Sequence, residues 1–399
     1  MTTQQIIQRT DAHIIGSYGR FPVAFIGGSG ATLTDAEGKR YIDFASGIGV
    51  NSLGYAHPAW VAAVSSQAAS LAHVSNLYYT QPGAELAEKL TARSGMAAAF
   101  FSNSGAESNE GLIKLARKYS YDTYGSQARK VILTLENSFH GRTLATLEAT
   151  GQEKFHGADF APYTGGFRYV QPGDIGAVRA ACAPGDVCAV LIELIQGEGG
   201  VFPLPREYVA ELAEFCAEND VLLLIDEVQT GIGRTGKLFA YQYFNVKPDA
   251  VSFAKGIGGG LPLGGFLVSE KLRGTLTAGT HATTFGANPV CCAAANAVLD
   301  TLNDAALDEV TRKGDVIRDF VKSANLPHLG EIRGLGLMLG IEVKAPLTHR
   351  ELVAKLLTNG LVALTAGSDT LRFLPPLTIS DSELQAGLQI LADTVNPRI

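Results

Sequence analysis

The sequence lacks the signatures of several large classes of protein. Its five cysteines are an odd number and none is spaced as C-x-x-C, so neither a disulfide framework nor a dithiol redox site is indicated. Its eight histidines are scattered, and no H-E-x-x-H pattern or Cys/His cluster occurs, so we expect no bound metal. A formal net charge of -7, with no basic run anywhere, argues against nucleic acid as a partner.

Long apolar runs are also missing. No apolar stretch reaches the length that a membrane-spanning helix needs, so no membrane partner is expected. Residues Met1 to His13 are polar and lack the basic-then-apolar pattern of a signal peptide, which favours a cytoplasmic location. The 399 residues are 46% hydrophobic and 18% charged, which suits a large core and is long enough for two domains. No internal repeat or low-complexity linker interrupts the chain.

The middle of the chain alternates between strand-like and helix-like segments. Unbroken apolar runs, typical of strands buried on both faces, occur at residues 130–135, 188–194, 221–225 and 250–254. Between them lie segments with helical spacing, such as residues 207–219. This alternation predicts an α/β fold with a mostly parallel central sheet.

The two flanks differ from this middle region. Residues 1–55 carry a turn and hairpin pattern at residues 31–43, and we interpret them as a loop-and-hairpin arm that contributes to a smaller domain. Residues 56–288 form the predicted large, ligand-binding domain. Residues 289–399 begin with an alanine-rich helix at residues 289–302 and form the predicted small α+β domain.

Polar residues stand at the carboxyl ends of the predicted strands. Glu136, Glu193, Asp226 and Lys255 each lie at or near the end of an apolar run. In open α/β sheets, ligands bind in the crevice outside the carboxyl ends of the strands. A lysine and an aspartate at that edge are the minimal equipment for pyridoxal 5′-phosphate (PLP), because the amine binds the cofactor covalently and the carboxylate keeps its pyridine nitrogen protonated.

A candidate phosphate site lies upstream of these residues. The small and polar residues 103–109 precede a segment with helical spacing at residues 112–119. Backbone N–H groups at the start of a helix can approach a phosphate, and the helix dipole favours the anion. Taken alone, Ser104 is explained as an ordinary helix N-cap. The presence of Lys255 and Asp226 in the same chain favours the phosphate interpretation.

One segment imitates a nucleotide-binding loop. Residues 231–237 match G-x-x-x-x-G-K, the start of a P-loop, but Leu238 stands where Ser or Thr should contact Mg²⁺. The segment also does not follow directly from a strand. The glycines after Lys255 fail the G-x-G-x-x-G spacing of dinucleotide-binding folds. A nucleotide-binding function is therefore disfavoured.

Together these segments resemble the class III, fold type I PLP-dependent aminotransferases. The resemblance runs from about Phe21 to Pro376. It rests on six stretches in order: residues 103–107 (NSGAE), 138–143 (SFHGRT), 196–200 (QGEGG), 226–231 (DEVQTG), 254–256 (AKG) and 283–289 (TTFGANP). Softer matches at residues 49–54, 73–79 and 371–376 make the chain most similar to the members of the class that use N-acetyl-L-ornithine.

The resemblance implies a cofactor site in the large domain. The implied cofactor-binding residues are Gly105, Ala106, Phe139, Asp226, Glu227, Val228, Gln229, Lys255 and Thr284, with Lys255 and Asp226 as the catalytic pair. Gly105 and Ala106 would give backbone N–H groups to the phosphate. Phe139 would stack on the pyridine ring, and Gln229 would lie near its O3′ oxygen. Thr284 would reach the phosphate bound to a neighbouring subunit, which implies a homodimer with shared active sites.

The resemblance also implies how substrates bind. The implied substrate-binding residues are Arg142, Thr283, Glu198 and Arg372. Two arginines would hold substrate carboxylates, and Glu198 would pair with an arginine when the amino donor carries no second carboxylate. The implied reaction is ping-pong transfer of an amino group from N-acetyl-L-ornithine to 2-oxoglutarate, in arginine biosynthesis.

Two kinds of alternative stay open at this point. One is another amino donor within the class, such as ornithine, succinylornithine, succinyldiaminopimelate or 4-aminobutyrate. The other is a protein of the PLP fold that does not transaminate, such as a racemase or a binding protein. The implied pair of arginines with Glu198 argues against the second kind, because a racemase has no need to recognise two different substrates.

Several positions have a second interpretation or depart from the family pattern. In the second interpretation, Phe139 is a core residue without a cofactor role, Arg372 is a surface arginine, and Glu193 is a structural residue. The departures are Ser108 and Gly111 for alanines, Leu194 for a proline, and Ala287 for a glycine. Gly111 is expected to weaken its helix by roughly 1 kcal/mol.

Overall fold

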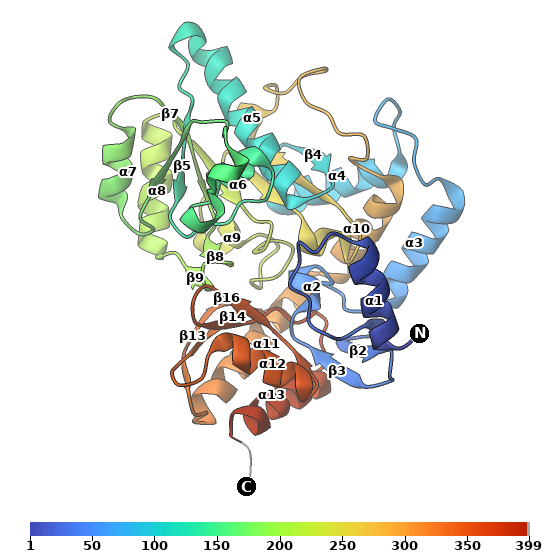
Figure 1. The fold of residues 1–399 in the computed structure, drawn as a ribbon. Coiled ribbons are helices and arrows are strands. Elements are labelled where there is room, and N and C mark those ends of the chain that lie inside the picture. The colour runs from blue at the N-terminus through green and yellow to red at the C-terminus, as the bar shows by residue number, and fades with distance from the viewer. Residues whose placement is uncertain (397–399) are drawn as a thin grey trace.

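A seven-stranded sheet forms the centre of the larger part of the protein (Figure 1). The structure is a computed structural model that describes residues 1–396. The sheet order is β4-β12-β11-β10-β7-β5-β6, and β12 runs antiparallel to both of its neighbours, whereas the pairs from β11 to β6 are parallel. Its strands are β4 (Ala98–Ser102), β5 (Val131–Leu135), β6 (Phe167–Val170), β7 (Val187–Ile192), β10 (Leu222–Asp226), β11 (Ala250–Phe253) and β12 (Gly264–Val268).

The four predicted buried strands are confirmed as neighbours in this sheet, namely β5, β7, β10 and β11. Alternate residues of one strand enter different cores: Leu223 packs into one hydrophobic cluster and Leu224 into another. Both side chains are almost completely buried, because helices cover the two faces of the sheet. This explains why these strands are continuous apolar runs rather than alternating ones.

The helices of this part follow the strands in the predicted rhythm. The helix expected at residues 207–219 is confirmed as α8. The helices are α3 (Pro58–Ser70), α4 (Gln81–Ser94), α5 (Gly105–Tyr124), α6 (Leu144–Ala149), α7 (Ile175–Cys182), α8 (Arg206–Glu218), α9 (Ala240–Phe244) and α10 (Pro289–Thr301). A short pair, β8 (Ile195–Gln196) and β9 (Phe202–Pro203), lies beyond β7.

The C-terminal part contains an antiparallel sheet covered by three helices (Figure 1). The sheet order is β13-β14-β17-β16. Its elements are β13 (Leu329–Leu335), β14 (Met338–Val343), β16 (Leu364–Ala366), β17 (Thr370–Phe373), α11 (Asp304–Ser323), α12 (His349–Thr358) and α13 (Asp381–Val395). Helix α10 packs against α3 and α4 of the larger part, although the predicted boundary at residue 289 assigns it to the small domain. The domain boundaries stay predictions.

The N-terminal arm joins the C-terminal part through a second sheet. Strands β1 (Phe25–Ser29), β2 (Thr32–Asp35) and β3 (Arg40–Asp43) form the predicted hairpin, and β3 pairs with β15 (Leu361–Val362). The prediction of a loop-and-hairpin arm omitted the helix α1 (Thr3–His13). No residue of α1 is buried, so it has no apolar stripe to reveal it, and its Thr2–Gln5 capping box is the one local signal. A short irregular helix, α2 (Ser46–Gly49), ends the arm.

Two negative findings concern the described residues 1–396. None of the helices formed by these residues combines the length and the apolar character needed to cross a membrane. Within the same range, no group of three or more His, Cys, Asp or Glu side chains is arranged to hold a metal ion.

Candidate active site

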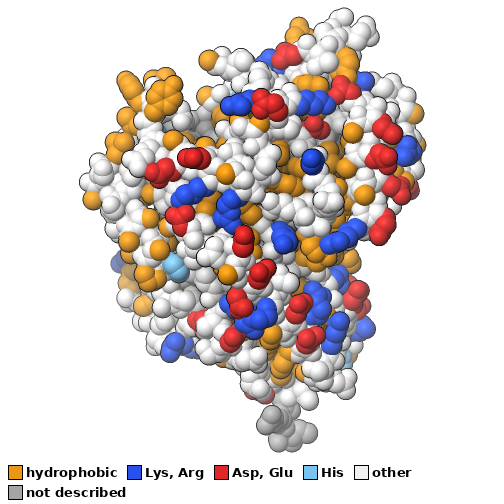
Figure 2. Space-filling view, turned by 180° about the vertical axis from the view of Figure 1, so that it is seen from behind, with side chains coloured by type: hydrophobic (Ala, Val, Ile, Leu, Met, Phe, Trp, Pro, Cys, Tyr) orange, Lys and Arg blue, Asp and Glu red, His pale blue; other side chains and the backbone are white. Residues whose placement is uncertain are grey.

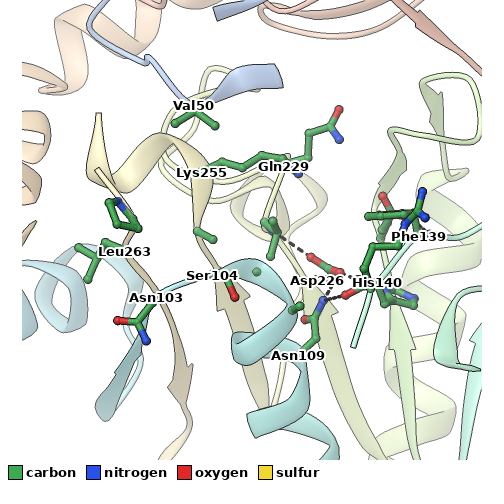
Figure 3. A pocket seen from close by; sticks show the side chains of 18 of the residues that line it. Val50, Asn103, Ser104, Asn109, Phe139, His140, Asp226, Gln229, Lys255 and Leu263 are labelled. Atoms are coloured by element: carbon green, nitrogen blue, oxygen red, sulfur yellow. Dashed lines mark hydrogen bonds and ion pairs between the residues drawn. The ribbon is translucent and has the colours of Figure 1, made fainter. Parts of the chain in front are cut away.

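A hydrogen-bonded carboxylate at the end of β10 is the central feature of the site. Asp226 Oδ2 accepts a hydrogen bond from Asn109 Nδ2 at 2.7 Å and lies 2.8 Å from His140 Nδ1, which donates in the tautomer protonated there (Figure 3). Its Oδ1 accepts a hydrogen bond from the backbone N–H of Val228 at 3.0 Å. Because Asp226 is only 4% exposed, these donors hold a buried carboxylate in one orientation.

Lys255 lies beyond the neighbouring parallel strand, β11. It begins the 3-10 helix η4 (Lys255–Gly258) with a φ of 43°, a left-handed conformation that is uncommon for a lysine. Figure 3 shows its side chain extending across the cavity beside Gln229. Burial lowers the pKa of the Lys255 amine, although the negative charges of Glu198 and Asp226 act in the opposite direction. A lowered pKa makes the amine a better nucleophile and proton carrier near neutral pH.

The N-terminus of α5 faces the same space. Ser104 caps the helix by accepting a hydrogen bond from the backbone N–H of Glu107, so the N-cap interpretation is confirmed. The first N–H groups of a helix have no acceptor within it, and the dipole favours an anion there. A Cβ at Gly105 would lie 2.6 Å from Cγ1 of Val228, so this first position has no room for a side chain.

These elements surround a cavity of about 480 Å³. A buried amine, an oriented carboxylate, a helix N-terminus and the ring of Phe139 all line it. The volume is in the range of cofactor and small-ligand sites. Amine, acid, anion-binding backbone and aromatic wall are the four groups that PLP requires, so the residues present fit this cofactor.

The aromatic wall of the cavity also holds a cation. The guanidinium carbon of Arg142 lies 5.6 Å from the ring centre of Phe139 and 4.3 Å from that of Phe155. Contacts of this kind attract a cation to the ring faces. Arg142 lines the cavity, so a carboxylate can approach it there.

A second arginine is buried and paired. Arg372, on β17, is 3% exposed, and its Nη1 donates to Glu198 Oε1 at 2.6 Å and to Gln229 Oε1 at 3.1 Å. The interpretation of Arg372 as a surface arginine is therefore wrong. Burial acts to raise the pKa of Glu198, but the Arg372 guanidinium, with the charge of Lys255 and a hydrogen bond from Gln229, holds that pKa below its usual value. The pair touches the cavity through Gln229, which lines it.

A third carboxyl group, that of Glu193, lines the cavity. Its Oε1 accepts a hydrogen bond from the backbone N–H of Phe139 at 2.8 Å, and its Oε2 accepts one from Gly197 at 3.2 Å. Burial raises the pKa of Glu193 to about 7, with His140 opposing that rise and Asp226 adding to it. Glu193 both lines the cavity and supports the backbone under Phe139.

Comparison with known proteins identifies the family. Residues 17–395 match the model of the family described as aminotransferase class III. The chain belongs to the class III aminotransferases. The match covers the arm from residue 17 onward, the cavity and the C-terminal part together.

Individual relatives of this aminotransferase cover it almost completely. It is 50% identical to an acetylornithine aminotransferase of Haemophilus ducreyi over 99% of this chain and 100% of that protein. Among solved structures, it resembles an N-acetylornithine aminotransferase of Stenotrophomonas maltophilia (36% identity, TM-score 0.84, 98% of each chain covered). It also resembles an ornithine aminotransferase of Toxoplasma gondii in which PLP partly occupies the active site (30% identity, TM-score 0.93, 99% and 94% covered). The predicted fold, the PLP-dependent transferase fold type I, is confirmed by these neighbours.

The structure brings most of the predicted site residues together. Those that line the cavity are Gly105, Ala106, Phe139, Arg142, Asp226, Val228, Gln229 and Lys255. Glu198 and Arg372 lie one contact further out, joined to the cavity by Gln229. Their individual roles stay predictions that this geometry supports.

Four predicted or candidate residues point elsewhere. Thr283 and Thr284 line a separate surface hollow, which connects to the cavity through the hydrogen bond from Asn103 Nδ2 to Thr283 Oγ1 at 3.0 Å. The carboxylate of Glu227 faces away from the cavity and accepts hydrogen bonds from the first residues of α9. Glu136, at the end of β5, is bonded to Gln171 and does not line the cavity either.

Sequence reasoning missed the two side chains that orient Asp226. Asn109 stands one turn inside α5, and its Nδ2 also donates to the backbone carbonyl of His140 at 2.8 Å. His140 belongs to the stretch 138–143, and Asn109 has polar neighbours in sequence, so neither position indicates a contact with Asp226. Both side chains are nearly completely buried in the structure.

The positions that depart from the family pattern have structural explanations. A Cβ at Gly111 would lie 2.3 Å from the Phe266 ring, so glycine permits close packing of α5 on β12. Ser108 Oγ donates to the carbonyl of Ser104 at 2.8 Å and accepts from the N–H of Gly265 at the same distance, tying α5 to that strand. Leu194 is fully buried in the core. Ala287 has a φ of 55°, a conformation in which glycine is less strained.

Proposed function

We propose that the protein transfers the terminal amino group of N-acetyl-L-ornithine to 2-oxoglutarate. The products are N-acetyl-L-glutamate 5-semialdehyde and L-glutamate, and the reaction belongs to arginine biosynthesis. The class III family and the 50% identity to an acetylornithine aminotransferase support this reaction. The observation that carries the proposal is the pair of buried Arg372 and partly exposed Glu198 beside the cavity of Lys255 and Asp226.

PLP is the cofactor that these residues would hold. When bound, it supplies an electrophilic carbonyl and an electron-withdrawing ring for the removal of a proton next to nitrogen. The first N–H groups of α5, at Gly105 and Ala106, would hold its phosphate. The Asp226 carboxylate, oriented by Asn109 and His140, would stabilise a proton on its pyridine nitrogen. Lys255 Nζ would be the attachment point and, when free, the group that holds a proton beside the substrate carbon.

Two substrates use the same cavity in turn, and the arginines distinguish them. Acetylornithine has one carboxylate, which Arg142 at the cavity wall can bind bidentately. The terminal amine of acetylornithine must approach Lys255. Because no second carboxylate is present to bind Arg372, Glu198 neutralises that arginine. 2-Oxoglutarate has two carboxylates, so the second one competes with Glu198 for Arg372. The same ion pair therefore serves an amino donor and a dicarboxylate acceptor.

We also propose a homodimer in the cytoplasm. The loop between α3 and α4 exposes Leu77 (86%) and Tyr78 (66%), and Phe285 is 57% exposed near it. Figure 2 shows hydrophobic side chains projecting at the upper left, where this loop lies. Asn76 Nδ2 donates to the carbonyl of Gly286 at 2.8 Å, so the loop and the segment of Thr284 form one surface. A second subunit covering this surface would receive Thr284 at its own cofactor.

The test is a single half-reaction. Purified protein loaded with PLP is mixed with N-acetyl-L-ornithine alone, and the absorption of the bound cofactor is followed in time. Conversion to the amino form of the cofactor, much faster than with ornithine or 4-aminobutyrate, is the expected result. Conversion only with ornithine would keep the reaction and change the donor, an outcome that the similarity to ornithine aminotransferase makes worth measuring. No conversion with any amine would refute transamination.

A further inference from the structure

The segment that imitates a P-loop has no access to a nucleotide. Residues Gly231 to Gly236 are buried, and they pack against the C-terminal part of the chain. A Cβ at Gly233 would lie 2.9 Å from Leu307 Cδ2, and one at Gly236 would lie 2.2 Å from Thr311 Oγ1. Both contacts are with α11. The segment is therefore a joint between the two parts of the molecule.

Arg234 is the polar centre of this joint. It is 2% exposed, and its Nη1 donates to the carbonyls of Leu337 at 3.1 Å and Pro375 at 2.5 Å. Its own carbonyl accepts a hydrogen bond from Leu337 N–H at 3.0 Å. Burial lowers the pKa of the Arg234 guanidinium to about 9, although the charge of buried Asp43 opposes this. Burying a cation against neutral carbonyls is costly, so a hydrophobic residue would serve packing alone better.

The carbonyl of Pro375 connects Arg234 to the substrate-binding arginine. Pro375 follows Arg372 by three residues, just beyond the end of β17. The same stretch is tied to the arm, because Ser46 Oγ donates to the carbonyl of Leu374 at 2.6 Å and Leu374 N–H donates to Phe44 at 2.7 Å. The backbone after Arg372 is thus fixed at two consecutive residues.

A single segment of the chain, residues 227–239 between β10 and α9, therefore contacts both the Arg372 guanidinium and the backbone just after Arg372. The segment between β10 and α9 carries Gln229, whose Oε1 accepts from Arg372 Nη1 at 3.1 Å. It also carries Arg234, which holds the backbone after Arg372. This segment follows directly from Asp226 at the end of β10. It therefore links the position of the Arg372 guanidinium to the strand that carries the proposed cofactor-binding aspartate.

We propose that Arg234 is a positioning residue that sets where the Arg372 guanidinium stands relative to Glu198 and the cavity, and so controls recognition of the dicarboxylate acceptor. This inference rests on the proposed function, in which Arg372 binds the second carboxylate of 2-oxoglutarate. Without the clamp, β17 stays paired with β14 and β16, but the backbone beyond it is held at Leu374 by Ser46 and Phe44 and no longer at Pro375, so this end of the strand can shift. A shift of about 1 Å at a binding group can cost on the order of 10²-fold in rate.

The experiment separates the two half-reactions in Arg234→Gln and Arg234→Lys. For Arg234→Gln we expect the KM for 2-oxoglutarate to rise about tenfold or more, with the acetylornithine half-reaction and the cofactor absorption within about twofold of the unmodified protein. Arg234→Lys should rescue part of the loss, since an ammonium can reach one carbonyl but not two. The matched control is Arg318→Gln, because Arg318 also donates to two backbone carbonyls, those of Ile332 and Gly334 in β13.

The outcomes are distinct. An unchanged KM for 2-oxoglutarate in a folded Arg234→Gln protein would overturn the inference, and so would an equal fall in both half-reactions. If Arg234→Gln does not fold, Ser46→Ala removes the other side-chain tie to the same strand end and should raise the same KM to a smaller extent; no rise would overturn the inference. If Arg372→Gln itself leaves the KM for 2-oxoglutarate unchanged, the failure lies in the proposed function instead.

Discussion

The two sets of predicted cofactor contacts lie in opposite surroundings. Asp226 is buried and receives hydrogen bonds from Asn109, His140 and the chain itself. Thr284 stands beside Phe285, on a surface with exposed aromatic and aliphatic side chains. The first set is assembled completely by one chain. The second, Thr284, lies at an exposed surface and contacts no cofactor cavity within its own chain.

The difference shows which part of the site one chain completes and which part the proposed homodimer would have to complete. The orientation of the buried Asp226 carboxylate must be set within one subunit, because changing it would break several hydrogen bonds. An exposed apolar loop beside a polar residue is the usual anatomy of an interface. Substitutions can alter either region separately, and those in the buried region are expected to have the largest effects.

Replacement of Lys255 is expected to have the largest effect. In Lys255→Ala the cavity keeps Asp226 and the N-terminus of α5, so PLP should still bind, but without a covalent bond. Turnover should fall by at least about 10⁴-fold, because both the attachment point and the proton carrier are lost. Steady-state assays and the absorption of the bound cofactor measure the two effects. Undiminished turnover would refute the assignment of Lys255.

The substitution Asp226→Asn is expected to have the next largest effect on turnover. The amide keeps the size of the side chain but removes the charge that stabilises a protonated pyridine nitrogen, so we expect turnover to fall by roughly 10²–10³-fold. Cofactor binding should persist. A stopped-flow measurement of the half-reaction with acetylornithine tests this, with His140→Phe as the companion variant that keeps the Asp226 charge but loses a donor to it. A near-normal rate in Asp226→Asn would remove Asp226 from its role.

The buried region was largely predictable from the sequence, and physics explains why. Strands covered on both faces are continuous apolar runs, so their ends, and the residues Asp226 and Lys255 at those ends, are visible without a structure. The cavity then follows from the general rule for open sheets. The helix N-terminus near Gly105 was visible for the same reason, as small residues before a helical segment.

The supporting contacts were not predictable, because they join residues far apart in sequence. Asn109 and Asp226 are 117 residues apart, and nothing local indicates their hydrogen bond. Gly111 was expected to weaken α5, yet the ring of Phe266 occupies the space where a side chain would stand. Arg234 belongs to a stretch that resembles a P-loop in sequence, but in the structure this stretch is buried and Arg234 binds backbone carbonyls of the C-terminal part. In each case a tertiary contact overrides the local pattern.

The exposed region is tested by a charge on its surface. Tyr78→Asp places a carboxylate on the loop between α3 and α4, and we expect it to weaken subunit association. The dissociation constant for PLP should rise about tenfold, the effect of losing one hydrogen bond to the phosphate from the partner. Sedimentation and cofactor titration measure the two quantities. Tyr121→Asp is the matched control, since Tyr121 on α5 is 65% exposed against 66% for Tyr78. Equal effects in both variants would contradict the interface.

The smallest expected effect concerns Glu227, the neighbour of Asp226 that faces away from the cavity. Its Oε1 accepts from Tyr241 N–H at 2.8 Å, and its Oε2 accepts from Ala240 N–H at 2.7 Å. Burial nevertheless raises the pKa of Glu227 from its usual 4.5 to about 7, against those hydrogen bonds. In this interval the folded protein binds more protons than the unfolded chain, so the free energy of unfolding falls as the pH rises from 4.5 to about 7.

Glu227→Gln removes this contribution to the pH dependence. The free energy of unfolding of the variant should fall less steeply over the same interval, while turnover stays within about twofold of the unmodified protein. Chemical denaturation at several pH values measures the slope, and Glu211→Gln, at an exposed position of α8, should leave it unchanged. An unaltered slope in Glu227→Gln would mean that Glu227 is not the titrating group. A large loss of cofactor binding would instead place its side chain at the active site, against the direction in which it points.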